Sequence, residues 1–330
     1  MKKVMNAAVS YVDDMLAGLC LAHERHFRQS ERRVIVRAGG AIAGKVGIVT
    51  GGGSGHLPVF TGYIGPGLLD AAAIGDVFAS PSADQMASAM RHANGGAGVL
   101  RLYGNYGGDV MNFDMAGEML EMEDIASTTV LLADDVASAP AAEADKRRGV
   151  AGMVFAFKAA GARAEERATL EEVTASAQKT ANACRSIGFA LTPCIVPQAG
   201  KPTFNLADDE MEMGMGIHGE PGIWRDKLKP ADAITDEMVD HLLTDMPLGK
   251  GERISLLVNS LGATPLEELY IIYKRIRERF DEKGVTIVAP LVGRYATSME
   301  MAGASITLCR LDSEIERLLA APCDCPYWKI

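Results

Sequence analysis

Short β-rich runs alternate with longer helical patterns along the whole chain, and no other feature constrains its fold as strongly. Alternation of this kind predicts an α/β architecture. The length of 330 residues favours two domains over a single large one. We therefore expect two α/β domains with strands alternating with helices. The strand candidates are Arg33–Ala38, Val46–Thr50, Val99–Tyr103, Thr128–Leu132, Phe189–Val196, Met211–Ile217, Arg253–Asn259, Val285–Val288 and Ser305–Cys309.

Two capping-box patterns locate helices on the sequence. Ser-x-x-Gln at residues 82–85 predicts a helix over Ala83–His92. Thr-x-x-Glu at residues 169–172 opens a second helix, Leu170–Arg185, in the same way. Apolar residues also recur at helical spacing over Pro265–Lys283, which predicts a helix with one buried face.

A long predicted helix marks the expected domain boundary. Division at its end gives an N-terminal α/β domain of residues 1–185 and a C-terminal α/β domain of residues 186–330. Both lengths are ordinary for a domain. Two of the candidate functional residues, His56 and Asp109, fall in the first domain, and His218 falls in the second.

Charge and cysteine spacing exclude several classes of protein. With 33 basic and 43 acidic residues the formal net charge is −10, which opposes non-specific binding to nucleic acid and provides no polybasic membrane signal. No apolar run reaches the ~18 residues of a membrane-spanning helix. The six cysteines match no disulfide framework or zinc site, so we expect reduced thiols in a cytoplasmic protein. For Cys323 and Cys325 a turn near the end of the chain is favoured over a metal site.

Gly51–His56 has four glycines among six residues, directly after a strand candidate. Glycine lets backbone N–H groups approach a ligand closely, at a cost in chain entropy. A strand that leads into such a loop usually meets a phosphate or a small polar ligand. This loop ends in histidine rather than in the Gly-Lys-Ser/Thr of a nucleotide-binding P-loop. It therefore presents a titratable imidazole.

Two further glycine-rich segments follow strand candidates and end in a titratable group. Gly104–Asp109 ends in aspartate, and Gly214–Gly219 contains His218. In the strand candidate before His218, methionines and Ile217 alternate with a face of small residues, which leaves space beside the imidazole. Sites in α/β proteins lie at such strand ends.

Simpler interpretations apply to each segment taken alone. Asp109 is placed to cap a helix beginning at Val110, glycine loops are often tight turns, and single histidines are mostly hydrogen-bonded surface groups. The coincidence of two glycine-flanked histidines and one glycine-flanked aspartate at strand ends favours an α/β enzyme with a His/His/Asp site.

Several multi-residue motifs occur in order along essentially the whole chain. They are Gly51–Pro58, Gly62–Gly65, Gly75–Pro81, Asn105–Phe113 and Gly216–Gly222. Together these motifs closely resemble the dihydroxyacetone kinase family. The resemblance is to its substrate-binding K subunit, or to the equivalent N-terminal domain of single-chain ATP-dependent forms.

The resemblance implies a mechanism and a set of site residues. The family's covalent histidine falls on His218, whose imidazole adds to the substrate carbonyl as a hemiaminal, and its acid/base pair falls on His56 and Asp109. A ketose has the carbonyl carbon that this capture needs, whereas glycerol does not. The implied substrate-binding residues are Gly53, Ser54, Gly55, His56, Gly104 and Asp109.

One position departs from the family. Dihydroxyacetone-specific members usually have a substrate-contacting lysine where this chain has Gly104. The change removes a hydrogen-bond donor, and we expect it to open space for a longer ketose such as a tetrulose. It is also compatible with a binding-only paralogue.

No P-loop, kinase glycine loop or persuasive magnesium site occurs in the sequence. The resemblance therefore implies that this chain binds no cofactor or metal. A separate L-type subunit would supply the nucleotide with Mg²⁺, as ATP used directly or as ADP recharged by a phosphotransferase-system protein. The family also implies a homodimer. The alternative function is a ketose-sensing co-regulator of transcription; retention of His56 and Asp109 favours catalysis.

Overall fold

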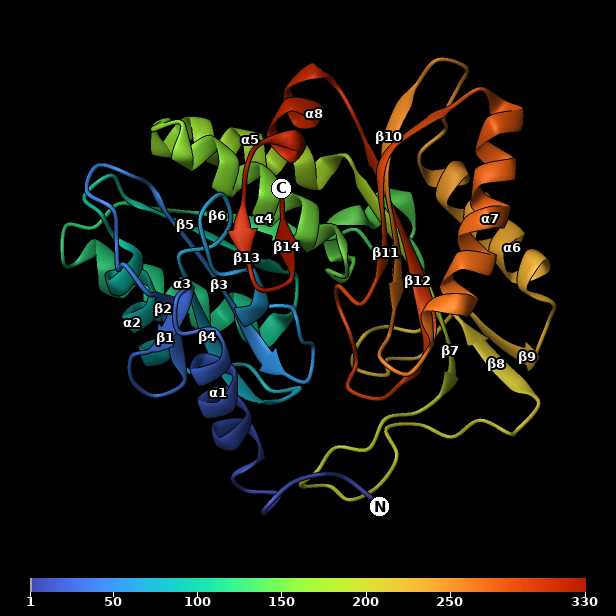
Figure 1. The fold of residues 1–330 in the computed structure, drawn as a ribbon, viewed down its shortest axis with the longest axis horizontal. Coiled ribbons are helices and arrows are strands. Elements are labelled where there is room, and N and C mark those ends of the chain that lie inside the picture. Colours follow the sequence, from blue (N-terminus) through green and yellow to red (C-terminus); the bar gives the residue numbers. More distant parts are fainter. Residues whose placement is uncertain (1) are drawn as a thin grey trace.

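Two six-stranded sheets form the framework of the protein (Figure 1). The computed structural model describes residues 2–330. The first sheet has the order β1-β2-β4-β3-β5-β6, and its strands β3, β4, β5 and β6 are parallel. Its strands are β1 (Phe27–Gln29), β2 (Val34–Arg37), β3 (Gly47–Ser54), β4 (Ala71–Val77), β5 (Val99–Gly104) and β6 (Ser127–Leu132).

The second sheet is mostly antiparallel and has the order β11-β10-β12-β7-β8-β9. Only β10 and β11 pair in parallel. Its strands are β7 (Cys184–Thr192), β8 (Glu210–Met213), β9 (Trp224–Lys227), β10 (Arg253–Ser260), β11 (Thr286–Gly293) and β12 (Ala302–Arg310). The predicted α/β class with two sheets is confirmed.

Helices cover both sheets. In the first sheet α2 and α3 pack on one face and α4 and α5 on the other, while α6 and α7 pack on the second sheet. The helices are α1 (Tyr11–Ala22), α2 (Ala83–Ala93), α3 (Gly107–Glu121), α4 (Gly152–Glu165), α5 (Leu170–Asn182), α6 (Ala231–Asp245), α7 (Leu266–Lys283) and α8 (Ser313–Ala320), with short 3₁₀ turns at Thr61–Tyr63 and Ala141–Lys146. Both predicted capping boxes form, at the starts of α2 and α5.

Helix α4 lies between the two sheets and contacts strands of both (Figure 1). Twelve of its fourteen residues are buried, as expected for a helix that is apolar all round. Asp134 caps its start, because the carboxylate accepts from the backbone N–H of Val150 at 2.9 Å and of Gly152 at 2.8 Å. One hydrophobic core therefore extends across both halves of the chain.

The glycine run belongs to strand β3 and is not a loop until after Ser54. All eight residues of β3 are buried. Its glycines make room for neighbouring side chains and backbone: a Cβ on Gly52 would lie 2.3 Å from the ring of Phe60, and one on Gly53 would lie 2.8 Å from Cα of Phe78. Glycine inside a strand often marks such a close approach.

Two other predicted boundaries are wrong for local reasons. The helix expected to reach Arg185 ends at Asn182, and β7 begins at Cys184. The domain boundary that we propose at 185/186 thus falls inside β7. The strand expected to run to Ile217 ends at Met213, because Gly214 turns the chain with a φ of +81°.

The last residues form a small hairpin, β13 (Asp324–Cys325) and β14 (Trp328–Lys329). The hairpin packs on the first half of the chain, where the N–H of Asp324 donates to the carbonyl of Pro66 at 3.0 Å. The predicted turn at Cys323 and Cys325 is thus confirmed, and all six cysteines are free thiols. Within residues 2–330, no helix combines the length and the apolar character needed to cross a membrane.

Candidate functional site

The three sequence-predicted residues His56, Asp109 and His218 come together from both sheets. His56 follows β3, Asp109 lies in the first turn of α3 after β5, and His218 lies in the connection between β8 and β9. The rings of His56 and His218 meet edge to face with centroids 4.7 Å apart. The charge of His218 also acts on the pKa of Asp109. The fold therefore brings the three residues together, although His218 lies in a connecting segment beyond the end of β8 and not directly at a strand end.

His56 is a buried, neutral imidazole with one free nitrogen. Its Nδ1 lies 2.7 Å from the carbonyl oxygen of Thr297, and because a carbonyl only accepts, Nδ1 carries the hydrogen. Nε2 is buried without a hydrogen-bond partner. Burial, with the charge of His218 second, lowers the pKa of His56 to about 3. The ring therefore presents a lone pair at neutral pH.

Asp109 does not cap helix α3. The N-cap position is Tyr106, and no side chain caps the helix there. Asp109 is 6% exposed, and its Oδ1 has no hydrogen-bond partner. Burial raises the pKa of Asp109 to about 6, against the opposing effects of the Ser80 hydroxyl and His218. A carboxylate with that pKa is suited to accept a proton near neutral pH.

The carboxylate of Glu220 holds His218 in place. Glu220 belongs to the motif Gly216–Gly222, but the sequence alone assigned it no role. Glu220 accepts from the ring Nδ1 of His218 at 2.9 Å and from the backbone N–H of His218 at 2.9 Å. Burial would raise the pKa of Glu220, but the hydrogen bond and charge of His218 and the charge of Arg148 outweigh it and lower that pKa to about 2. The ionised carboxylate fixes the hydrogen of His218 on Nδ1.

Two aromatic rings enclose the histidines. Phe78 stacks on His56 with centroids 5.0 Å apart and meets the edge of His218 at 5.4 Å. Tyr106 meets His218 at 4.6 Å, and its hydroxyl donates to the carbonyl of Gly149 at 2.9 Å. Phe78 has a φ of +57°, an uncommon backbone state for a bulky residue and one that often occurs at functional sites.

The space expected beside Gly104 is filled by the protein. A Cβ on Gly104 would lie 3.1 Å from Cε2 of Tyr106 and 3.3 Å from Sδ of Met153. The expected opening for a longer substrate is therefore not found at this position. Of the two expected effects of Gly104, only the loss of the lysine hydrogen-bond donor remains.

A cleft of about 380 Å³ borders the segment that carries His56. Its lining includes Ser54 and Gly55 from the segment itself, and the cationic side chains Lys3 and Arg294. Lys3 forms an ion pair with Glu300. The cleft thus places a positively charged side chain, Arg294, in the same lining as Ser54 and Gly55, the residues that precede His56.

Comparison with known proteins identifies the family. The Dak1 domain matches residues 17–327. The dihydroxyacetone-binding subunit DhaK of PTS-dependent dihydroxyacetone kinase 2 from Listeria innocua is 45% identical over 100% of both chains. This chain belongs to the dihydroxyacetone kinase family. Another family relative, the D-erythrulose kinase of Mycolicibacterium smegmatis, is 42% identical over 100% of this chain, which spans 57% of that enzyme.

Solved structures of the family share the fold. The dihydroxyacetone kinase of C. freundii superposes with a TM-score of 0.90 at 31% identity, over 99% of this chain and 60% of that one. The dihydroxyacetone kinase operon co-activator DhaQ superposes with a TM-score of 0.89 at 32% identity, over 96% of this chain and 98% of that one. The resemblance and the fold class expected from the motifs are both confirmed.

Proposed function

We propose that this chain is the ketose-binding subunit of a dihydroxyacetone-type kinase. It binds dihydroxyacetone or a four-carbon ketose such as erythrulose as a hemiaminal on His218 and presents the terminal hydroxyl for phosphorylation. One observation carries the proposal: the Glu220-bound imidazole of His218 packs edge to face against the ring of His56, and Nε2 of His56 and Oδ1 of Asp109 are both buried without a hydrogen-bond partner. Buried polar atoms without partners are rare in folded proteins, and each one calls for an explanation. In the proposed site a substrate hydroxyl supplies the missing partner.

Covalent capture selects the substrate class. A ketose has an electrophilic carbonyl carbon for the imidazole, whereas glycerol has only hydroxyls, so the bond discriminates between molecules of similar polarity. The bond also fixes the terminal hydroxyl in one orientation, which lowers the entropic part of the barrier to phosphoryl transfer.

Asp109 is the better candidate for the general base. Its pKa of about 6 lies near the operating pH, while that of His56, about 3, makes a weak base. We assign to Asp109 the removal of the hydroxyl proton and to Nε2 of His56 a hydrogen bond from a substrate hydroxyl. The sequence alone left these two roles open.

Backbone groups and one hydroxyl complete the proposed ketose site. Gly53, Ser54 and Gly55 lie next to His56 in the chain, and the buried Ser54 hydroxyl has no hydrogen-bond partner. We assign these groups to the substrate hydroxyls, together with the backbone of Gly104. Glycine has no side chain, so position 104 offers no side-chain donor to the substrate. Because one of the relatives is a D-erythrulose kinase, a four-carbon ketose is a reasonable substrate.

The phosphoryl group is proposed to come from a partner. Among the residues that the structure describes, no group of three His, Cys, Asp or Glu side chains is arranged to hold a metal ion. We assign ATP, or ADP recharged by a phosphotransferase-system protein, and Mg²⁺ to an L-type subunit. The relative from Listeria innocua is named as a subunit of a PTS-dependent kinase, which supports such a partner. We also propose a homodimer and, given six free cysteines, a cytoplasmic location.

The second candidate function is a ketose-sensing co-regulator. It is favoured by the close superposition on the co-activator DhaQ. Retention of His56 and Asp109 with perturbed pKa values favours the kinase, because a sensor has no need to remove a hydroxyl proton.

The deciding experiment mixes the protein with an L-type subunit and either ATP or a recharging system, in the presence of dihydroxyacetone, each erythrulose enantiomer or glycerol. We expect phosphorylation of at least one ketose and none of glycerol. Tight ketose binding without any turnover would reject the kinase and favour the co-regulator.

A further inference from the structure

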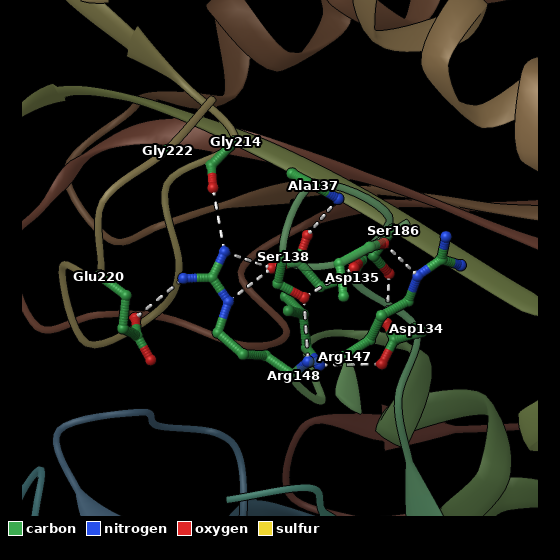
Figure 2. A network of polar contacts seen from close by, with 12 residues as sticks. Asp134, Asp135, Ala137, Ser138, Arg147, Arg148, Ser186, Gly214, Glu220 and Gly222 are labelled. Atoms are coloured by element: carbon green, nitrogen blue, oxygen red, sulfur yellow. Dashed lines mark hydrogen bonds and ion pairs between the residues drawn. The ribbon is translucent and has the colours of Figure 1, made fainter. Parts of the chain in front are cut away.

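A polar network extends from the buried Asp135 to the carboxylate that holds His218 (Figure 2). The guanidinium of Arg148 lies at its centre. It donates to Oδ2 of Asp135 from Nε at 2.9 Å and forms an ion pair from Nη2 at 2.7 Å. Nη2 also donates to the carbonyl of Gly214 at 3.1 Å, while Nη1 lies 3.9 Å from Oε2 of Glu220.

The Asp135 end of the network is rigidly built. Asp135 is 2% exposed, and burying such a carboxylate is costly unless it is paired. Its backbone N–H donates to the carbonyl of Arg148 at 3.1 Å, and its Oδ1 accepts from the N–H of Ala137 at 3.0 Å. The N–H of Arg148 donates in turn to the hydroxyl of Ser138 at 3.0 Å. Arg148 is thus fixed through both its backbone and its side chain.

The Glu220 end of the network acts on His218. One carboxylate oxygen of Glu220 binds the ring Nδ1–H and the other binds the backbone N–H, so that both the ring and its main chain are oriented. We propose that Asp135, Arg148 and Glu220 form a positioning relay that keeps the hydrogen of His218 on Nδ1 and directs the lone pair of Nε2 at the ketose carbonyl. The inference rests on the proposed function and assigns roles to three residues outside the predicted site.

The relay also matches the charge that develops during capture. The lone pair of Nε2 forms the bond to the carbonyl carbon, and the π electrons of the broken C=O bond move to the oxygen. That oxygen takes a proton from a solvent water molecule, which leaves as hydroxide and is neutralised by the buffer. The ring becomes an imidazolium, with its remaining hydrogen on Nδ1 facing the Glu220 carboxylate. Opposite charge at hydrogen-bond distance stabilises this state. For metal-ligating histidines, loss of a carboxylate that holds the other ring nitrogen typically costs about 10- to 100-fold in affinity or activity, and we expect an effect of similar size here.

The relay can be tested by NMR on protein labelled with ¹⁵N-histidine and saturated with [2-¹³C]dihydroxyacetone. Glu220→Gln retains the side-chain shape without the charge, and Arg148→Lys retains the charge without the three contacts. We expect a ¹³C–¹⁵N coupling at Nε2 of His218 in the parent protein. For Glu220→Gln we expect a ~10- to 100-fold lower capture constant and a ring ¹⁵N spectrum in which the Nδ1–H tautomer is no longer dominant. The capture constant and the Nδ1–H tautomer population of Arg148→Lys should lie between those of the parent and those of Glu220→Gln.

Arg147→Lys is the matched control. Arg147 is 2% exposed and pairs with Asp245 at 2.5 Å, but it has no contact with Glu220. We expect this variant to retain the tautomer and the capture constant even if its melting temperature falls. A general loss of stability would affect both arginine variants, whereas the relay predicts an effect on the His218 tautomer from Arg148 alone.

The NMR results distinguish an error in the proposed relay from an error in the proposed function. If the parent protein shows no carbon–nitrogen coupling at His218 with [2-¹³C]dihydroxyacetone or with [2-¹³C]erythrulose, covalent capture itself is wrong. If the parent shows the coupling and Glu220→Gln retains the parent tautomer and capture constant, the relay is wrong while the function stands. Coupling through Nδ1 instead of Nε2 would also overturn the relay.

Discussion

His56 and His218 lie side by side, yet the two regions that hold them give their rings different chemistry. In both rings Nδ1 donates a hydrogen bond, and Nε2 is left with its lone pair. The acceptor is the backbone carbonyl of Thr297 for His56 and the carboxylate of Glu220 for His218. A carbonyl orients a ring without compensating a positive charge, whereas a carboxylate does both.

This difference divides the work between the two histidines. An imidazole that adds to a carbonyl carbon becomes cationic, and the buried environment of His56, which lowers its pKa to about 3, opposes a cation there. His218, 22% exposed and paired with Glu220, accommodates that charge. In the proposed mechanism, burial and the partner of Nδ1 together distinguish the covalent histidine from the neutral, hydrogen-bonding one.

Removal of His218 should have the largest effect of all the substitutions considered. His218→Ala should abolish covalent capture, because His56 cannot carry the charge of the adduct, and phosphorylation should fall to background with it. A crystal soaked with ketose and the NMR coupling experiment both report the bond. His241→Ala changes a histidine on α6, a helix that packs on the second sheet, and should retain both. Capture that persists without His218 would show that His56 is able to react.

Asp109→Asn should separate capture from transfer. The variant retains both histidines and therefore the hemiaminal, but it loses the proposed general base. We expect the turnover number to fall by ~10²- to 10⁴-fold, with the ketose capture constant changed far less. Steady-state kinetics with the L-type partner, together with the capture measurement, checks this. An equal loss in capture and turnover would assign Asp109 to binding alone.

The same substitution should stabilise the fold at neutral pH. Burial raises the pKa of Asp109 from 3.8 to about 6, so the folded protein holds this proton more tightly than the unfolded chain. Its contribution to the unfolding free energy is therefore highest below about pH 4 and declines as the pH rises through about 6. Asp109→Asn removes the cost of ionising this buried carboxyl, and we expect a gain of ~1–3 kcal/mol at pH 7.

Urea denaturation of the parent and Asp109→Asn across pH 4–8 measures this effect. The difference between them should vanish near pH 4. His56 has the opposite sign, because its lowered pKa means that the unfolded chain gains the proton first and stability is lost as the pH falls below about 6.5. A difference that does not change with pH would show that Asp109 is not perturbed as described.

The sequence predicted which residues of the candidate site come together better than it predicted their surroundings. Strand-end glycines flanking His56, Asp109 and His218 singled out three residues that the fold brings together from both sheets. Strand β4, with the sequence Ala-Ala-Ala-Ile-Gly-Asp-Val, was missed because it is poor in β-branched residues. The role of Arg148 depends on contacts made only in the folded chain, so no local pattern indicates it. Glu220 was detectable in principle, as a carboxylate two residues after His218.

The glycine run Gly51–Gly53 was recognised in the sequence, but its structural role differs from the predicted one. Its composition indicated a loop that approaches a ligand, yet within β3 the glycines admit Phe60 and the backbone of Phe78. Phe78 then stacks on His56. Gly52 and Gly53 therefore also act on the site through the packing of aromatic rings. Composition alone does not distinguish that effect from ligand contact.

The smallest expected effect concerns Gly104. Gly104→Lys returns the donor found in dihydroxyacetone-specific members, but its Cβ would lie 3.1 Å from the ring of Tyr106, which contacts His218. We expect kcat/KM to shift toward the three-carbon ketose by less than ~10-fold, since one added hydrogen bond competes with displacement of that ring. Gly104→Ala adds the Cβ without the donor and separates the two causes. Equal shifts in both variants would attribute the preference to Tyr106, and no shift in either would show that position 104 does not set it.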